Sequence, residues 1–326
     1  MADAIQVGRR VILGTGGTIA GRAARAGDNV GYVAGQVRVE DLIASVPPLA
    51  GLPLELEQVA QIDSKDMGFA VWQQLARRVA HHLVRDDVDG VVITHGTDTV
   101  EETAYFLQAV LQPLKPVVLT CAMRPATALV PDGPQNLLDA VLVAGSEAVH
   151  GVVVVCAGLI HSAEHVAKVH SYRVDAFDSG DAGPLGCVEE GAIRLFHAGS
   201  ARPDGPVLDA QGLARVLQAK SLPRVTWLSS HADADGAVVH GLLAHGAVHP
   251  EQMPRGLVVA GTGNGTLHQS LADALLLAQV AGVRVVRATR CARGRVIPGA
   301  TSPFPDSAGL SPAKARIALA LELLGH

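Results

Sequence analysis

Short runs of apolar, largely β-branched residues recur along the chain, with helical stretches between them. This alternation is typical of parallel strands joined by crossover helices. We expect strands at Arg10–Leu13, Gly90–Thr94, Pro116–Thr120, Gly151–Cys156, Val225–Ser229, Gly256–Ala260 and Arg284–Ala288. We expect helices at Phe69–Val84, Glu101–Val110, Asn136–Ala144, Leu267–Ala281 and Ala313–Leu324, the last with Ser311 as N-cap and Pro312 at its first position.

The alternation weakens over residues 198–220, where Gly, Pro, Asp and Gln dominate. We therefore predict an α/β fold with a larger N-terminal domain, residues 1–197, in which helices flank a mostly parallel sheet. Residues 198–220 would connect it to a smaller C-terminal α/β domain, residues 221–326. Because ligands bind beyond the carboxyl ends of strands in open parallel sheets, the loops after the strands are the places to seek function.

Composition narrows the possible partners. Hydrophobic residues make up 48% of the 326 positions and charged residues 17%, the profile of a densely packed globular enzyme. The net charge is −5, without a long basic stripe, and only ten aromatic residues are present, so we expect no nucleic-acid partner. No apolar run is long enough for a membrane span or a signal peptide, which predicts a cytoplasmic protein, or a periplasmic one if an export signal was removed.

The four cysteines, Cys121, Cys156, Cys187 and Cys291, are far apart in the sequence. Their spacing fits neither a disulfide framework nor a C-x-x-C zinc pattern. We expect most of them to be buried as small hydrophobic residues.

The loop after the first expected strand, Gly14–Gly21, carries hydroxyl groups among residues with almost no side chain. Glycine lets a substrate approach the backbone, and amide N–H groups can then form an oxyanion hole. A tight strand-to-helix turn or a phosphate loop is the alternative. The dinucleotide fingerprint fails because Ile19 takes the third glycine position, and no Gly-Lys-Ser/Thr ending makes a P-loop.

A second loop, Thr94–Thr103, places hydroxyls and carboxylates at the start of a helix. By spacing alone, Asp98 or Thr99 is more simply read as a helix cap, with the acidic residues favouring the positive helix end. Capping does not explain why both loops carry Gly-Thr in equivalent positions. His95 is a possible general base, but a packed histidine at a strand end is the better interpretation.

Residues His161–His165 match the H-x-x-E-H zinc pattern, and a metallopeptidase is a rival from another mechanistic class. The match is short, follows a buried strand and has no evident third ligand, while fourteen histidines make chance pairs common. We therefore expect neither a metal nor another cofactor.

Two long segments together resemble the signatures of bacterial L-asparaginases, especially the type II branch with its asparaginase–glutaminases. They are ILGTGGTIAG at 12–21 and VVITHGTDTVEETAYFL at 91–107. Further similar segments follow in the same order: YVAGQVRVEDLIASVP at 32–47, QIDSKDM at 61–67, AMRPATALVPDGPQNLLDAV at 122–141, GPLG at 183–186, AGTGNGTLHQS at 260–270 and LSPAKARIALALELL at 310–324. The resemblance thus covers nearly the whole chain.

The resemblance implies two catalytic groups. Thr15 would be the primary nucleophile, with Tyr32 on a closing lid beside it. Thr97, Asp98 and Lys168 would form the second group, in which a desolvated lysine accepts a proton from a hydroxyl. An unactivated threonine needs such a proton acceptor, fixed geometry and oxyanion donors to attack an amide.

The resemblance also implies a substrate site. Ser64 would hold the α-carboxylate and Asp98 the α-amino group of L-asparagine. The remaining substrate-binding positions implied are Gly14, Asp63, Gly96, Thr97 and Ala122. Asn264 would reach a neighbouring subunit's site, in a homotetramer built from two tight dimers.

The expected reaction releases ammonia and L-aspartate through an acyl ester on threonine. A dual glutaminase–asparaginase and a non-catalytic asparagine sensor are the alternatives. Asp63 and Lys65 depart from the family pattern beside Ser64, as do Val169 and His170 after Lys168. Residues 291–307 also lack the carboxylate that many type II members supply to the neighbour's site, so the sequence leaves the choice between asparagine and glutamine open.

Overall fold

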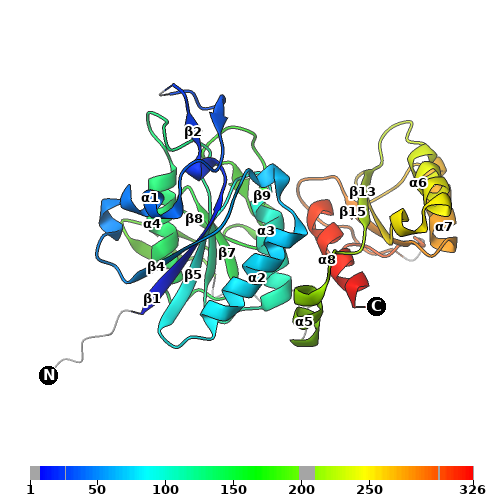
Figure 1. The fold of residues 1–326 in the computed structure, drawn as a ribbon. Coiled ribbons are helices and arrows are strands. Elements are labelled where there is room, and N and C mark those ends of the chain that lie inside the picture. Colours follow the sequence, from blue (N-terminus) through cyan, green and yellow to red (C-terminus); the bar gives the residue numbers. More distant parts are fainter. Residues whose placement is uncertain (1–7, 26, 198–209, 300–301, 326) are drawn as a thin grey trace. The chain divides into compact units, whose positions relative to one another are not determined.

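The computed structural model describes residues 8–25, 27–197, 210–299 and 302–325, and Figure 1 shows its fold. The chain divides into two compact units, Met1–Asp204 and Gly205–His326. Part of the predicted connector, residues 198–209, lies outside the described residues. Within the rest of it, Ala210–Gln218 form helix α5, so the composition change did not mark a segment without regular structure.

An eight-stranded sheet forms the centre of the first unit, in the order β12-β11-β8-β7-β6-β5-β1-β4. Strands β4, β1, β5, β6 and β7 run parallel, and β8, β11 and β12 continue the sheet in antiparallel pairs. The mostly parallel sheet is as predicted. The strands are β1 (Arg9–Gly16), β4 (Leu54–Ile62), β5 (Val88–Thr94), β6 (Val117–Thr120), β7 (Val152–Cys156), β8 (Leu159–Ser162), β11 (Gly186–Glu189) and β12 (Ala192–Leu195).

Helices cover both faces of this sheet (Figure 1). Helices α1 (Val39–Ala44) and α4 (Gly133–Ala144) pack on one face, and α2 (Phe69–Leu83) and α3 (Val100–Leu111) lie on the other. Helix α2 forms because its apolar residues recur at helical spacing and are buried as one stripe. Within that layer the Trp72 ring stacks on Phe106 of α3, with ring centroids 4.9 Å apart.

Short elements cluster at the carboxyl ends of the parallel strands. Two small antiparallel pairs join β2 (Arg22–Ala23) to β3 (Tyr32–Val33) and β9 (Ala167–Lys168) to β10 (Phe177–Asp178). Two 3-10 turns, Thr18–Ala20 after β1 and Ser64–Asp66 after β4, begin at hydroxyl residues. These elements bring the polar side chains of the predicted site to this edge.

The second unit contains a parallel sheet in the order β13-β14-β15. Its strands are β13 (Val225–Ser229), β14 (Gly256–Gly261) and β15 (Arg284–Thr289), and its remaining helices are α6 (Ala237–Val248), α7 (Gln269–Val280) and α8 (Pro312–Leu324). Leu257, Val259, Leu275 and Val285 lie in its buried core. Helix α8 begins as predicted, with Pro312 in its first turn and the Ser311 hydroxyl accepting the Lys314 N–H.

All the strands and helices predicted from the sequence are present, with ends shifted by a few residues. The elements that were not predicted include the charged strand β4, the antiparallel strands β8, β11 and β12, and the helices α1, α5 and α6. None of the helices in the described part of the chain is both long and apolar enough to cross a membrane.

Candidate active site

The loops after β1 and β5 meet backbone to backbone. Gly17 has φ +79°, and a Cβ built on it would lie 2.3 Å from the Cα of Gly96. A Cβ on Gly96 would lie 2.5 Å from the Ser64 Oγ. Only glycine permits both approaches, because any side chain would force these loops apart. Strands β4, β1 and β5 are neighbours in the sheet, so three strand ends converge here.

Thr15 lies near the end of β1, where this strand meets the start of the second loop. Its side chain is 1% exposed, and its Oγ1 donates a hydrogen bond to the Thr94 carbonyl oxygen at 2.8 Å. Because the hydroxyl donates its proton to Thr94, its oxygen lone pairs remain available to other groups. The structure thus places the Thr15 hydroxyl at the junction of the two loops. Its partner, Thr94, precedes Thr97 by three residues on the second loop.

Thr18 holds Tyr32, a contact that the sequence motif did not indicate. The Thr18 Oγ1 lies 2.7 Å from the Tyr32 hydroxyl. The Tyr32 ring packs against Gly21, where a Cβ would lie 2.8 Å from Tyr32 Cδ2. The first loop therefore turns its two hydroxyls to different partners, that of Thr15 to β5 and that of Thr18 to Tyr32.

Tyr32 lies on the β2–β3 hairpin, which has its own supports. At the tip, the Asp28 Oδ1 accepts the N–H groups of Val30 and Gly31 at 3.0 and 2.7 Å. At the base, the Ala23 N–H donates to the Thr127 Oγ1 at 2.9 Å. The hairpin that carries Tyr32 is therefore tied to the loop that follows β6.

Thr97, Asp98 and Lys168 lie together, although 70 residues separate Asp98 from Lys168 in the sequence. The Lys168 Nζ donates to the Thr97 Oγ1 at 2.8 Å and pairs with the Asp98 Oδ1 at 2.6 Å. The Glu101 carboxylate, in the first turn of α3, accepts the Lys168 backbone N–H at 2.6 Å. Glu101 thus docks β9 on α3 and positions the lysine beside Thr97.

Ser64 joins the same cluster from the turn after β4. It is 2% exposed, its Oγ accepts the Asp98 N–H at 3.2 Å, and its carbonyl accepts the Thr99 hydroxyl at 2.8 Å. Asp63, just before it, caps the short 3-10 turn and forms an ion pair of 2.7 Å with Lys65. The charges that departed from the family pattern beside Ser64 therefore offset each other.

Beneath the second loop a chain of hydrogen bonds fixes His95. Trp72 Nε1 donates to the Thr103 Oγ1 at 2.8 Å, and that hydroxyl contacts His95 Nε2 at 2.9 Å. His95 Nδ1 lies 2.7 Å from the Gly96 carbonyl oxygen, which can only accept. Complete burial lowers the pKa of His95 to about 4. The imidazole is thus a neutral support for Gly96, in agreement with the packed-histidine interpretation.

Two further predicted binding positions lie on β1 and beyond β6. At Gly14 a Cβ would lie 2.7 Å from Gln58 Nε2 and 2.9 Å from Val39 Cβ, so this glycine lets β1 pack closely on its neighbours. Ala122 lies just beyond β6, the neighbour of β5, and Asp132 accepts the N–H of Met123 at 2.9 Å. Ala122 is therefore held at the same edge of the sheet as Thr97.

Asn264 belongs to the second unit and is held within its own loop. Its Nδ2 donates to the Ile297 carbonyl at 3.2 Å, and its Oδ1 accepts the Ile297 N–H at 2.7 Å. The residue is exposed. Since an amide has two N–H groups and two oxygen lone pairs, each end can bind one more partner while the clamp on Ile297 fixes its orientation.

The H-x-x-E-H segment does not have the arrangement of a zinc protease. His161 lies on strand β8, is 1% exposed and contacts the Ser179 hydroxyl at 2.9 Å through Nδ1. His165 follows in a turn, so the two histidines do not share one helix face as that motif requires. Within the described ranges, no group of three His, Cys, Asp or Glu residues is placed to hold a metal ion.

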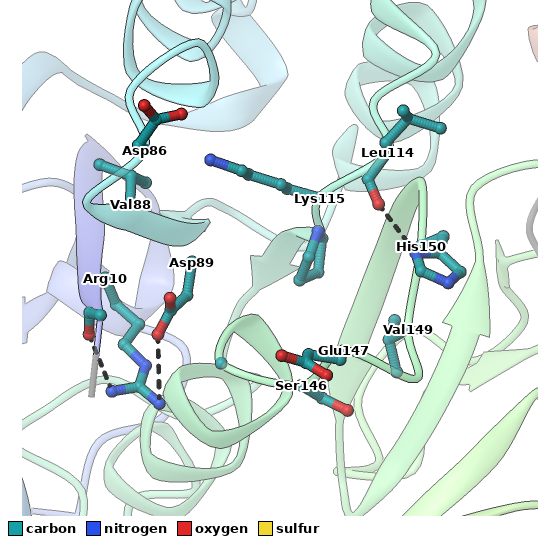
Figure 2. Close-up of a pocket in the computed structure, with 13 residues that line it drawn as sticks. Arg10, Asp86, Val88, Asp89, Leu114, Lys115, Ser146, Glu147, Val149 and His150 are labelled. Atoms are coloured by element: carbon teal, nitrogen blue, oxygen red, sulfur yellow. Dashed lines mark hydrogen bonds and ion pairs between the residues drawn. The ribbon is translucent and has the colours of Figure 1, made fainter. Parts of the chain in front are cut away.

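A cavity of about 430 Å³ lies at the opposite, amino-terminal edge of the sheet. Figure 2 shows Arg10 beside Asp89 at one side of it and Lys115 above its centre. It is lined by Gly8, Arg10, Asp86, Val88, Asp89, Leu114, Lys115, Pro116, Gly145, Ser146, Glu147, Val149 and His150. Because Thr15 and Thr97 lie at the carboxyl ends of β1 and β5, this cavity is separate from the candidate active site.

Fold and site together define a two-unit α/β enzyme with two hydroxyl-bearing loops joined at the carboxyl edge of a parallel sheet. Comparison with known proteins gives the family. The family described as "Asparaginase, N-terminal" matches residues 10–200, and "Glutaminase/Asparaginase C-terminal domain" matches residues 224–325. The chain belongs to the asparaginase family.

Comparison with individual relatives supports this family assignment. The chain is 39% identical to the glutaminase-asparaginase of Pseudomonas fluorescens biotype A, over 94% of this chain and 84% of that protein. It is 37% identical to L-asparaginase 2 of Escherichia coli strain K12, over 96% and 88%. The crystal structure of the probable cytoplasmic L-asparaginase from Campylobacter jejuni superposes with a TM-score of 0.86 at 37% identity, covering 98% of this chain and 96% of that one.

Proposed function

We propose that this protein hydrolyses the side-chain amide of L-asparagine to L-aspartate and ammonia. The observation that carries the proposal is the meeting of two hydroxyl-bearing loops, with Thr15 bonded to the end of β5 at 2.8 Å and Thr97 bonded to Lys168 at 2.8 Å. The names of relatives over 30% identical along nearly the whole chain support the substrate.

Thr15 is the proposed nucleophile, and Thr18 is the other hydroxyl on its loop. One feature favours Thr15. Its Oγ1 is bonded to the residue from which the second loop starts, whereas the Thr18 hydroxyl faces the Tyr32 hairpin. The 2.7 Å contact between Thr18 and Tyr32 favours Thr18 instead, because Tyr32 is the group that would move the proton, and the valine variants of the two threonines decide between them.

In the proposed first half-reaction, the Thr15 Oγ1 leaves the Thr94 carbonyl and attacks the amide carbon. A carbonyl oxygen cannot keep the released proton, so another group must carry it. Tyr32, which is hydrogen-bonded to Thr18, would relay this proton when the hairpin closes on the substrate: its hydroxyl takes up the Thr15 proton as it passes its own proton to the leaving nitrogen. Thr18 would keep Tyr32 in place without a bond to the substrate.

Collapse of the tetrahedral intermediate then breaks the C–N bond, and the protonated amine leaves as ammonia. Water attacks the acyl ester, which releases aspartate and returns the proton to Thr15. Closure of the hairpin would limit the access of water until the acyl ester has formed.

The second group, Thr97, Asp98 and Lys168, would orient the leaving nitrogen and the attacking water by hydrogen bonds. Since the Lys168 Nζ donates to the Thr97 Oγ1, Lys168 would act here as a hydrogen-bond donor and not as the proton acceptor that the resemblance implies. The Thr97 proton is directed away from the lysine and can form a hydrogen bond to the leaving nitrogen and then to the attacking water. Asp98 holds Lys168 in this position through the 2.6 Å ion pair.

The substrate has a negative α-carboxylate and a positive α-ammonium group, and each would bind a different residue of the site. The Ser64 Oγ accepts the Asp98 N–H, which leaves its own proton for the substrate α-carboxylate. The Asp98 side chain is 54% exposed, so one carboxylate oxygen can bind the α-ammonium while the other binds Lys168.

The other predicted positions would surround this pair. Gly96 and Ala122 would line the space between the two ends of the substrate. Asp63, neutralised by Lys65, would lie at its border, and Gly14 would support the site from behind by letting β1 pack closely.

Ammonia release from L-asparagine and from L-glutamine, measured side by side with a chelator present, tests the proposal. We expect turnover of asparagine that the chelator does not reduce. A comparable rate with glutamine would favour the dual activity named for the Pseudomonas relative. No ammonia from either amide, with asparagine still bound, would replace the proposal by a sensor.

We further propose a homotetramer, a dimer of tight dimers, located in the cytoplasm. The assembly rests on the family resemblance, and in it Asn264 would offer its second N–H to a neighbouring site. The location rests on the name of the Campylobacter relative. A Haemophilus influenzae relative carries a periplasmic name, so fractionation of the native cells decides between the two. Light scattering of the purified protein gives the assembly, and a monomer with full activity would contradict it.

A further inference from the structure

Two buried cysteines lie directly behind the candidate site. Cys121 follows the last residue of β6, and Cys156 ends the neighbouring parallel strand β7. Their exposed fractions are 1% and 4%. The strand register pairs Thr120 with Val155, so the next residues along both strands are Cys121 and Cys156, side by side on the same face.

Asn136 of α4 clamps these two strand ends together. Its Nδ2 donates to the Cys121 carbonyl at 2.9 Å, and its Oδ1 accepts the N–H of Ala157 at 2.9 Å. Neighbouring strands are about 4.8 Å apart, which lies within the Cα separations of about 4.4–6.8 Å that disulfides span. The backbone geometry therefore permits a bond between the two sulfurs.

The surroundings make the two thiols unequal. The Cys121 thiol hydrogen-bonds to Cys156, and His161 also contacts Cys156, so that the pKa of Cys156 is lowered to about 6 despite burial. Hydrogen bonding to Cys156, together with burial, holds the pKa of Cys121 well above its ordinary value, although the Lys168 charge opposes this. Ser179 fixes the His161 ring through Nδ1 at 2.9 Å. One sulfur is thus prepared as a nucleophile and its neighbour as the proton-bearing partner.

We propose that Cys121 and Cys156 form a dithiol that hydrogen peroxide oxidises to a disulfide. The Cys156 thiolate attacks one peroxide oxygen, the O–O bond breaks, and hydroxide leaves as water after taking a proton, giving a sulfenic acid on Cys156. The Cys121 sulfur then attacks the Cys156 sulfur and displaces the hydroxyl as a second water. Two thiols and one peroxide become one disulfide and two waters.

The disulfide would disturb the active site. The Cα separation of most disulfides is about 5.5–6 Å, whereas neighbouring strands are about 4.8 Å apart, so closure forces the two strand ends apart by up to about 1 Å. Ala122 is bonded directly to Cys121 and would move with it. Since misplacing a catalytic site by about 1 Å can cost about a hundredfold, we expect kcat/KM for asparagine to fall about tenfold to a hundredfold. This part rests on the proposed function, whereas the disulfide itself does not.

The test treats the purified full-length protein with hydrogen peroxide and then blocks free thiols under denaturing conditions. Peptide mass mapping without reductant should find the peptides of Cys121 and Cys156 linked, with two hydrogens lost. Ammonia release should fall in parallel and return after dithiothreitol. Because mapping needs neither a variant nor activity, the disulfide is tested even if asparagine proves not to be the substrate.

Cysteine variants test whether the loss of activity in peroxide depends on Cys121 and Cys156 or on the other two cysteines. Cys156→Ser should keep its activity in peroxide, and the matched controls Cys187→Ser and Cys291→Ser should lose activity as the unmodified chain does. Cys187 is buried elsewhere in the sheet and Cys291 is exposed. The proposal is overturned if mapping finds only Cys291 oxidised, or if both cysteines of the pair remain free while activity falls.

Discussion

Replacing Thr15 by valine removes one hydroxyl and leaves the shape of the side chain nearly unchanged. The lost contact is the 2.8 Å hydrogen bond to the Thr94 carbonyl, worth about 1 kcal/mol of folding stability. The catalytic loss is of another order, because no nucleophile remains to form the acyl ester. Loss of a nucleophile in hydrolases costs about four orders of magnitude or more in kcat, and we expect that here.

Thr18→Val is the matched control, three positions away in the same loop. It removes the 2.7 Å hydrogen bond to Tyr32, again about 1 kcal/mol of stability. Since Tyr32 would then be less well placed while the nucleophile remains, kcat/KM should fall by no more than about a hundredfold. Thr15→Ser, which retains a hydroxyl, should keep measurable turnover.

The assay is initial-rate ammonia release over a range of L-asparagine concentrations, with thermal unfolding to verify the fold of each variant. Calorimetric binding of L-aspartate shows that the site of Thr15→Val is intact. If Thr18→Val is folded but inactive while Thr15→Val turns over normally, Thr18 is the nucleophile and the assignment is refuted. Losses of four orders of magnitude in both variants would refute the division of roles between the two hydroxyls.

Three further changes test the surroundings. Lys168→Met should reduce kcat at least a hundredfold by leaving Thr97 and Asp98 without their shared cation, and undiminished ammonia release would exclude this role. The pKa of His95 is about 4 in the folded chain and 6.5 in its ordinary state, so between these values the unfolded chain binds a proton that the folded chain does not. The free energy of unfolding should therefore fall by about 3 kcal/mol as the pH drops from 6.5 towards 4. Urea titrations of His95→Gln should find a smaller loss. Among the described residues the buried Thr94 hydroxyl has no hydrogen-bond partner, so Thr94→Val should preserve the unfolding midpoint or raise it; a clear decrease would reveal a hidden partner.

The central strands could be predicted because their environment is simple. Val91, Val92 and Ile93 of β5 are all completely buried, as a strand covered on both faces by helices must be. A short run of β-branched residues bounded by turn residues is hard to reconcile with any element except a buried strand. The same pattern predicts that the functional loops lie at the carboxyl edge of the sheet.

Strand β4 could not be predicted, because it is an edge strand with charges on its outer positions. Glu57 binds Arg78 of α2 at 2.7 Å, and Glu55 binds Arg85 at 2.9 Å. These carboxylates interrupt the apolar pattern, and their partners lie far away in the sequence. Only tertiary pairing makes this segment a strand.

The contact between Thr18 and Tyr32 could not be predicted, for a backbone reason. Gly16 and Gly17 both have positive φ, +103° and +79°, so the chain changes its local direction between Thr15 and Thr18. Thr15 consequently faces β5 and Thr18 faces Tyr32. Sequence spacing predicts which residues share a loop, but the direction of each hydroxyl depends on dihedral angles that two glycines leave unrestricted.

The same glycines explain how the candidate site is held together. Gly17 and Gly96 touch through their backbones, and the Gly96 carbonyl is fixed by His95. The relative positions of the two loops are therefore set by backbone contact, which has far fewer alternative conformations than a contact between long side chains. The hydrogen bond from Thr15 to Thr94 joins residues 79 positions apart. Hydroxyls from distant parts of the chain can therefore act on one small amide. Because the two loops are already fixed, little of their conformational freedom is lost when the substrate binds.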